Sequence, residues 1–269
     1  MRTPTSTIAL LALACSTACS SAATGPNDAG PTADAAPADV AVPSDAKPDA
    51  GPVLDTHGVL VIGTLANPDL NAAQQQHDAI AAGGETPAKS AGDVGHAVML
   101  GTNILGTTEH EFLALDRWSA GANIDSFYGN PDFVKAFGSL FSAPPSRGIY
   151  VKRTTWATWA SVDAANDTDP HYWVVVRGTL KSATDATNQA THDQIVGGTK
   201  QQAMGAGDLG HVVYTGRDDA RSFVAIDVWR DATPIAAFYG NPQLQQAFGQ
   251  LFEGAPTVGV YASTHWRQW

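Results

Sequence analysis

The chain has 269 residues and a formal net charge of −11, because 26 Asp and Glu outnumber 15 Lys and Arg. Phosphate binding needs clustered Lys and Arg, so this balance argues against a nucleic-acid partner. The 2 cysteines, Cys15 and Cys19, both lie near the N-terminus. The remainder therefore has no disulfide, no thiol nucleophile and no thiolate ligand for a metal.

The first residues are typical of a secretory signal, since Arg2 precedes an apolar run at 8–14. This run is too short to span a bilayer, which needs about 20 residues. A signal that ends at a cysteine resembles that of bacterial lipoproteins, whose cysteine is acylated. Cys15 fits the residue types of that signal and Cys19 its length. We expect residues 1–19 to be a lipoprotein-type signal, with a plain secretory signal as the alternative.

Residues 20–56 are rich in Ala, Pro and Asp and contain no aromatic residue. Such a segment cannot bury enough apolar surface to offset its ordering entropy, so we expect a disordered tether. A lipid anchor followed by a tether predicts an extracytoplasmic protein attached to membrane lipid, at the cell surface or in the periplasm of a bacterium.

The rest of the chain can be aligned with itself. "GDVGH" at 92–96 returns as "GDLGH" 115 residues later, and "FYGNP" at 127–131 returns 111 residues later. The four missing residues fall in one segment, which predicts a loop. Both copies end on W-x-x-W. We therefore predict two repeats, 57–160 and 171–269, joined by a linker at 161–170.

Each copy follows one order of elements, read from hydrophobic period and turn residues. In the first copy these are a strand at 59–65, a helix at 67–84 that stops at Gly-Gly, strands at 95–100 and 112–118, a second helix after "FYGNP", and a strand at 147–156. The order βαββαβ, twice, predicts an α+β fold of two tandem ferredoxin-like units. Their bare sheet faces would cover each other as an intramolecular dimeric α/β barrel, so we expect a monomer.

The repeated "FYGNP" has a structural interpretation. Asn130 and Asn241 can each cap a following helix, and Pro131 and Pro242 then occupy its first position, where no N–H is needed. The helix continues with a Phe- and Leu-rich stripe at helical spacing.

A strand that ends in D-x-W, at 116–118 and 227–229, followed by N-P and a phenylalanine-rich helix, resembles the dimeric α/β barrel superfamily, specifically its antibiotic biosynthesis monooxygenase-like domains. The resemblance covers nearly all of 57–269, as two fused copies. It implies cofactor-independent oxidation of aromatic substrates, haem chemistry, or no known activity. Many monooxygenase-like members carry a histidine after this strand, where this chain has Phe and Tyr. We expect no cofactor.

Strand alternation places two carboxylates among candidate site residues. Val224, Ile226 and Val228 are apolar and are expected to face the helices, which leaves Asp227 and Trp229 facing the other unit. By correspondence, Asp116 and Trp118 do the same in the first copy. Such an aspartate could act as a base with a raised pKa, or simply accept the indole hydrogen bond.

Other polar side chains complete the candidate site. Arg177 stands where the first copy has Ile62, and could pair with Asp227 or with a ligand carboxylate, or lie in solvent at a strand end. Tyr128 and Tyr239 could present hydroxyls to a cavity or pack in the core.

Two histidines recur in each copy: His77 and His96, then His192 and His211. They could hold a divalent ion if helix and strand converge, but their spacing matches no metal signature. We favour a helix histidine bonded to the "GDVGH" segment and no metal. No nucleotide-binding or serine-hydrolase motif is present.

Three functions remain. The first is a binding module that holds a small, mainly apolar or aromatic molecule between the two sheets. The second is a cofactor-independent monooxygenase-like enzyme with Asp116 or Asp227 as its base. The third is a structural or interaction protein with a filled barrel. Surface tethering and the missing helix histidine favour binding.

Overall fold

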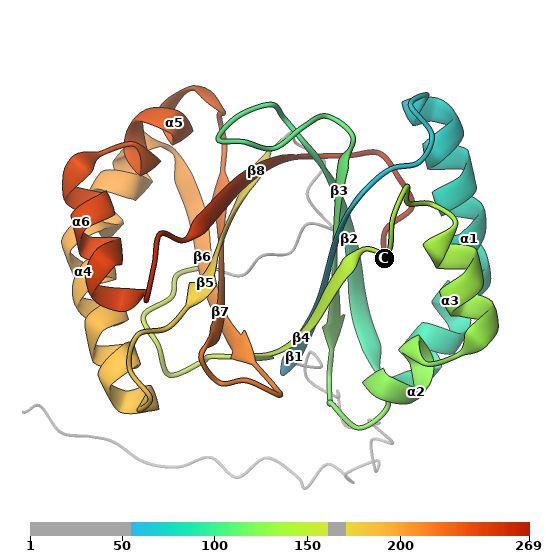
Figure 1. The fold of residues 1–269 in the computed structure, drawn as a ribbon, viewed down its shortest axis with the longest axis horizontal. Helices are drawn as coiled ribbons and strands as arrows, with labels where there is room; N and C mark the ends of the chain where they lie inside the picture. Colours follow the sequence, from blue (N-terminus) through green and yellow to red (C-terminus); the bar gives the residue numbers. More distant parts are fainter. Residues whose placement is uncertain (1–54, 161–170) are drawn as a thin grey trace, which may run out of the picture. The chain divides into compact units, whose positions relative to one another are not determined.

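The computed structural model describes residues 55–160 and 171–269, so the expected signal, both cysteines and the 161–170 linker lie outside its described residues. Each half contains one order of elements (Figure 1). The first half comprises β1 (His57–Thr64), α1 (Leu70–Ala91), β2 (Asp93–Gly101), β3 (Glu111–Trp118), α2 (Ile124–Tyr128), α3 (Pro131–Gly138) and β4 (Ser146–Lys152). The second comprises β5 (Tyr172–Thr179), α4 (Asp185–Ala206), β6 (Asp208–Gly216), β7 (Ser222–Trp229), α5 (Thr233–Tyr239), α6 (Pro242–Leu251) and β8 (Thr257–Ser263). Among these helices none has the length and apolar character needed to cross a bilayer.

The eight strands close into an antiparallel barrel in the order β1-β3-β2-β8-β5-β7-β6-β4. Two joints connect the halves: β2 with β8, and β4 with β6. Helices α1 to α3 cover one side of the barrel and α4 to α6 cover the opposite side (Figure 1). The fold is thus a mixed α/β barrel, as the sequence predicted.

The interior of the barrel is filled with side chains. One buried cluster draws on strands of both halves and contains Leu60, Ile62, Ala97, Met99, Leu113, Leu115, Trp173, Val175, Val212, Tyr214, Val224, Ile226, Val228 and Tyr261. A packed apolar cluster thus occupies the region between the two sheets where a ligand cavity was expected. Large aliphatic and aromatic side chains from both sheets interdigitate there at the close packing usual in protein interiors.

The predicted orientation of β7 is wrong. Val224, Ile226 and Val228 belong to the cluster inside the barrel, whereas Phe223, Ala225 and Trp229 pack with the helices α4 to α6. The same holds for β3, where Trp118 packs on the helix side. Alternation correctly separated the two sets of side chains. It assigned them to the wrong faces because in β7 the set without a polar member packs inside the closed barrel.

The long helices pass the predicted Gly-Gly stop. α1 continues through Gly83 and Gly84 to Ala91, and the residue that caps it is Gly92, with φ 111°. α4 likewise runs to Gly207, with φ 110°. Glycine inside a helix costs about 1 kcal/mol relative to alanine, an amount that packing against the sheet can offset. The left-handed conformation at the true end requires glycine far more strictly.

The interpretation of "FYGNP" is confirmed. The Asn130 side chain accepts from the N–H groups of Asp132 and Phe133, and Pro131 opens α3. Asn241 accepts from Gln243 N–H at the start of α6. The Phe and Tyr before each cap form the end of an additional short helix, α2 or α5, that the sequence did not predict.

The W-x-x-W segments cross between halves. Trp266, which follows β8, packs in the core beneath α1 to α3, while Trp156, which follows β4, packs beneath α4 to α6. Trp269 exchanges two backbone hydrogen bonds with His96, with N–O distances of 2.8 and 3.2 Å. Trp159 does the same with His211 at 2.8 and 3.2 Å. Each half is thus completed by the tail of the other.

The packed interior makes a stability prediction. Ile226→Ala removes a side chain of 0% exposure from the middle of the barrel. We expect it to lower the free energy of unfolding by about 2–5 kcal/mol, as for other buried Ile-to-Ala changes. Val134→Ala, at a side chain that is 50% exposed, is the control. Equal losses for both variants in urea titrations would contradict a solid interior.

Candidate functional site

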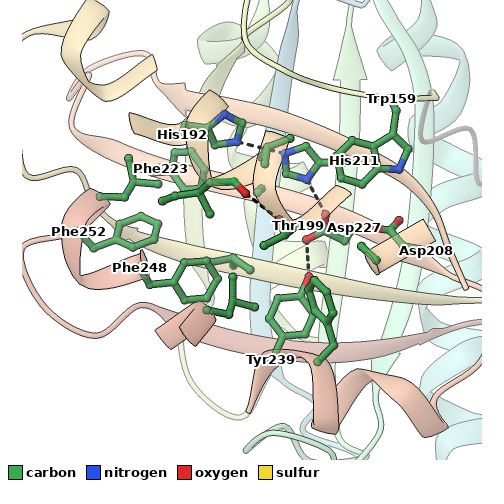
Figure 2. Close-up of a pocket in the computed structure, with 18 residues that line it drawn as sticks. Trp159, His192, Thr199, Asp208, His211, Phe223, Asp227, Tyr239, Phe248 and Phe252 are labelled. Carbon is green, nitrogen blue, oxygen red and sulfur yellow. Dashed lines mark hydrogen bonds and ion pairs between the residues drawn. The ribbon is translucent and has the colours of Figure 1, made fainter. Parts of the chain in front are cut away.

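Two equivalent small pockets, each lined by the same set of polar side chains, lie between the helices and the outer face of the barrel, and the first half also has a larger hollow of about 660 Å³ beside α3. The pocket of the second half has a volume of about 60 Å³ and its walls are mainly apolar side chains of α4, β7 and α6 (Figure 2). The pocket of the first half has a volume of about 30 Å³. Such volumes admit a few water-sized groups, whereas sites for drug-sized ligands occupy roughly 300–1,000 Å³.

A chain of buried polar side chains ends at the second pocket (Figure 2). His192 of α4 meets His211 of β6 through their Nε2 atoms, 3.1 Å apart. His211 Nδ1 lies 2.5 Å from Asp227 Oδ1, and Tyr239 OH donates to Asp227 Oδ2 at 2.5 Å. All four side chains line the pocket. The favoured interpretation of the helix histidine, as bonded to the "GDLGH" segment, is confirmed by the His192–His211 contact.

The first half repeats this chain. His77 Nε2 and His96 Nε2 are 3.2 Å apart, His96 Nδ1 contacts Asp116 Oδ1, and Tyr128 OH donates to Asp116 Oδ2. These four side chains also line their pocket. The two sequence copies thus form two sites. These sites have the same arrangement of polar side chains but different residues in their pocket walls.

In each half, the row of hydrogen-bonded side chains continues to the protein surface and ends there at a carboxylate. Asp78 Oδ1 lies 2.9 Å from His77 Nδ1, and the Asp78 side chain is 33% exposed. Asp193 Oδ1 lies 3.0 Å from His192 Nδ1, with the same exposure of 33%. Each carboxylate is held by the tail of the other half, through the N–H of Arg267 or Ala157.

An indole covers the inner histidine in each half. The ring of Trp269 stacks on His96 with centroids 4.5 Å apart, and that of Trp159 stacks on His211 at 4.7 Å. Each indole thus buries one face of the histidine ring that it covers.

A second carboxyl group lies beside each inner aspartate. Asp208 lines the second pocket, and its Oδ1 accepts from Gly210 N–H at a bulge of β6. Burial, and then repulsion from Asp227, raise the pKa of Asp208 to about 8. Asp93 is its counterpart, with a pKa raised to about 8 by burial and by Asp116. At neutral pH each pocket therefore contains a protonated carboxyl group that can donate.

The surroundings also fix the charge of the other groups. Burial, and then repulsion from His96, lower the pKa of His77 to about 4, and His192 is lowered to about 4 by burial and by His211. Burial and the adjacent aspartate raise the pKa of Tyr128 and of Tyr239 well above the ordinary value. The helix histidines and tyrosines are thus neutral at pH 7.

The structure brings together most of the predicted site residues, on the helix side of the sheet. Asp116 with Tyr128, and Asp227 with Tyr239, form direct hydrogen bonds. Trp118 and Trp229 lie beside these tyrosines, with ring centroids 6.1 and 6.2 Å apart.

Arg177 does not join them. Its neighbour on the same strand face, Val175, lies inside the barrel, so Arg177 is on the opposite face from Asp227 and the predicted pairing is wrong. Sequence reasoning also missed Asp93 and Asp208 as site residues. Their signal was the "GD.GH" motif itself, which returns with both the carboxyl group and the histidine in place.

The histidines do not form a metal centre. Within 55–160 and 171–269, no three His, Cys, Asp or Glu side chains are arranged so that they could hold a metal ion. Both ring nitrogens of His77, His96, His192 and His211 already lie within hydrogen-bonding distance of another side chain.

Solved structures with a similar fold come from the dimeric α/β barrel proteins. An anthrone oxidase-like protein matches at TM-score 0.55 and 17% identity, over 80% of this chain and 94% of that chain. A "putative monooxygenase" from Fusobacterium nucleatum matches at 0.54 and 9%, over 80% and 94%. A "putative chlorite dismutase" matches at 0.50 and 10%, over 78% and 95%. No protein-family model and no curated protein sequence matches the chain.

The raised pKa of the second carboxyl group makes stability depend on pH. Between about pH 4 and pH 8, Asp93 and Asp208 are ionised in the unfolded chain but protonated when folded. Each therefore lowers the free energy of unfolding as pH rises through this window, by about 1 kcal/mol per pH unit. The Asp93→Asn/Asp208→Asn variant, whose amides do not ionise, is expected to gain stability over the wild type across this range.

The difference between variant and wild type is the quantity to measure, by urea unfolding at several pH values. His77 and His192 act in the opposite direction below pH 6.5, because they stay neutral when folded to about pH 4. Their contribution is common to both proteins and cancels. A difference that does not change with pH would show that both carboxyl groups ionise normally in the folded protein.

Proposed function

We propose that each helix-side pocket binds a small, mainly apolar molecule and that its carboxyl pair transfers a proton to or from that molecule. The observation that carries this proposal is the pair Asp208 and Asp227, which share the second pocket and of which Asp208 has its pKa raised by burial and by repulsion from Asp227. Two titratable groups whose pKa values are pushed apart can serve as acid and base in one site. The proposal keeps the small apolar ligand of the sequence analysis and moves it from the barrel interior to the helix side.

The geometry assigns roles to the second site. Asp227 is oriented by His211 and Tyr239 and accepts the proton, while neutral Asp208 donates a hydrogen bond to the oxygen that gains charge. The apolar walls strengthen both interactions because they exclude water. A small carbon acid with a carbonyl or nitro group beside the acidic C–H has the required shape. Asp116 and Asp93 have the same roles in the smaller first pocket.

The alternative is a cofactor-independent monooxygenase-like enzyme. Its support is the fold, shared with an anthrone oxidase-like protein and a "putative monooxygenase". In this reaction Asp227 removes a proton from a CH₂ group of the substrate, and the resulting carbanion reduces O₂. The CH₂ group and O₂ thus become a carbonyl group and water. A pocket of about 60 Å³ favours a much smaller substrate than a polycyclic aromatic compound.

A non-catalytic structural or interaction protein is the second alternative. The filled barrel interior favours it, as does the complete internal pairing of the buried histidines. Satisfied polar networks of this kind also make a core specific.

We further propose that the chain is a fused pair of ferredoxin-like units. The four strands of each half, numbered 1 to 4 along that half, lie side by side in the order 4-1-3-2. Anchoring to membrane lipid through Cys15 or Cys19, and an extracytoplasmic location, remain part of the proposal on the sequence signal alone.

Proton abstraction is tested by deuterium exchange. The full chain is incubated in D₂O with nitroethane or acetone, two carbon acids small enough for the pocket, and C–H loss is followed by NMR. We expect the protein to accelerate exchange, and Asp227→Asn to reduce that acceleration by about 100-fold, the size of a general-base contribution. Remaining activity is expected to require Asp116.

The matched control is Asp231→Asn, at an exposed aspartate two residues after β7. Oxygen uptake with anthrone in the same preparations tests the monooxygenase alternative. Exchange rates equal to those of buffer, together with no oxygen uptake, would overturn both catalytic proposals and leave the structural protein.

A further inference from the structure

The larger hollow beside α3 is lined by neither of the two carboxyl pairs. Its volume of about 660 Å³ is within the roughly 300–1,000 Å³ of sites for drug-sized ligands. Most of its wall consists of apolar side chains from β1, from α3 and from the segment between α3 and β4. Apolar surface gathered in one concave place is typical of a site where a ligand or a partner binds.

The wall of this hollow is rich in aromatic rings. Phe133 and Phe137 of α3 are half-buried, and their rings stack with centroids 5.5 Å apart and an interplanar angle of 10°. Phe141 meets Phe137 edge to face at 5.2 Å. Pro144 and Pro145, which precede β4, complete this part of the wall. Flat and rigid rings suit a flat aromatic ligand, because few side chains lose freedom when it binds.

A single charged side chain, Arg147 of β4, stands among the described residues that line the hollow. Its partner across the β1–β4 ladder is Val61, which lines the hollow too, so both side chains are on the helix side of the sheet. The guanidinium lies over the ring of Tyr128, 5.3 Å from the ring centroid, and its Nη1 donates to the Tyr128 carbonyl oxygen at 3.2 Å. These contacts hold the cation in the wall.

No carboxylate neutralises this cation. Within 55–160 and 171–269, Arg147 forms the two contacts with Tyr128 and no ion pair. A guanidinium has five N–H donors, and the Tyr128 carbonyl engages one of them. Most of the donors of Arg147 are therefore available to a negatively charged ligand in the hollow.

The second half shows that the fold does not require a charge at this position. Val258 stands where the first half has Arg147. Gln245 stands where it has Val134, and its Nε2 donates to the carbonyl oxygen of Tyr239 at 2.5 Å. This carbonyl, like that of Tyr128, is at the end of a short helix, where carbonyl groups lack partners within the helix. An uncharged amide thus meets the same structural need.

We propose that the hollow beside α3 is a binding site for a flat aromatic carboxylate. The rings of the ligand lie against Phe133, Phe137 and the two prolines, and its carboxylate accepts from Arg147. A planar guanidinium matches a carboxylate in shape and can donate two parallel hydrogen bonds to it. This site needs no proton transfer, so it goes beyond the proposed function and does not depend on it.

The charges favour a ligand with a single negative charge. One guanidinium balances one carboxylate, whereas a phosphate monoester would bring a second negative charge to a chain of net charge −11. The stacked phenyl rings favour an aromatic ligand over an acyl chain, which has no flat face to place against them.

Isothermal titration calorimetry of the full chain with naphthalene-2-carboxylate at pH 7 tests this site. We expect a single equivalent to bind, because the second half has Val258 in place of the arginine. Arg147→Val is expected to weaken binding by about 10- to 100-fold, the usual effect of losing hydrogen bonds to a charged group. Arg147→Lys keeps the charge but not the planar fork, so we expect an intermediate affinity.

Matched controls separate this site from general effects of charge and of folding. Arg230→Val removes an exposed positive charge from the second half and is expected to leave the affinity unchanged. Val134→Gln introduces the longer side chain of the second half at an exposed position, so it is expected to narrow the hollow and weaken binding even if Arg147→Val fails to fold. Naphthalene-2-methanol lacks the charge and decanoate lacks the rings, and each is expected to bind at least about 10-fold more weakly.

Several results would overturn the proposal. One is no binding of naphthalene-2-carboxylate at millimolar concentration, and another is equal affinity in the wild type, Arg147→Val and Val134→Gln. Decanoate that binds as tightly would indicate a site for acyl chains. Self-association that Arg147→Val abolishes, without binding of the naphthoate, would indicate a docking surface for a second copy of the chain. The proposed function fails separately, because its test follows proton exchange at Asp227, which does not line this hollow.

Discussion

The closed barrel with its dry interior is the constraint on which the other features depend. The large apolar side chains of both sheets fill the barrel interior, and Asp116 and Asp227, on the other face of their strands, lie on the outer side, under the helices. Asp116 and Asp227 are therefore buried against α-helices rather than in a central cavity. Both would be costly there as isolated charges, and each is instead bonded to an imidazole and a phenol.

Each half of the chain supplies the tail that completes the site of the other half, so the two halves build both sites together. Residues that follow β4 complete the site beneath α4, and residues that follow β8 complete the site beneath α1. The contacts of each buried network thus depend on the position of the opposite half. A shift of the tail would uncover the inner histidine and release the outer carboxylate. Two barrel halves that paired only through short strand contacts, such as the three residue pairs of β4 with β6, gain a second connection in this way.

The two sites share their polar residues and differ in their walls. Leu244 and Phe248 line the second pocket where Phe133 and Phe137 line the first, and the volumes are about 60 and 30 Å³. A larger aromatic side chain in the same position reduces the space that a ligand can occupy. Of these two equivalent pockets the second is therefore the larger, while the first half retains the same hydrogen-bonded row of side chains.

The sequence by itself determined the order of the strands and of the main helices, the asparagine caps of α3 and α6, and the recurrence of the polar residues of the site, because these depend on local period and on spacing along the chain. Asn130 and Pro131 specify a helix start whatever surrounds them. Alternation in β7 likewise separated Asp227 from Ile226 correctly. The sequence could not say which set faces inward, since both faces of this sheet are buried and the pattern is the same seen from either side.

Only the tertiary structure decided the rest. The pairing of His192 with His211, the crossing of the tails and the displacement of the pockets to the helix side all join residues distant in sequence. Their contacts depend on how the barrel closes. At the Gly-Gly pairs, packing along the sheet outweighed a local preference to stop the helix. The two long helices end instead at Gly92 and Gly207, where the backbone takes the left-handed conformation.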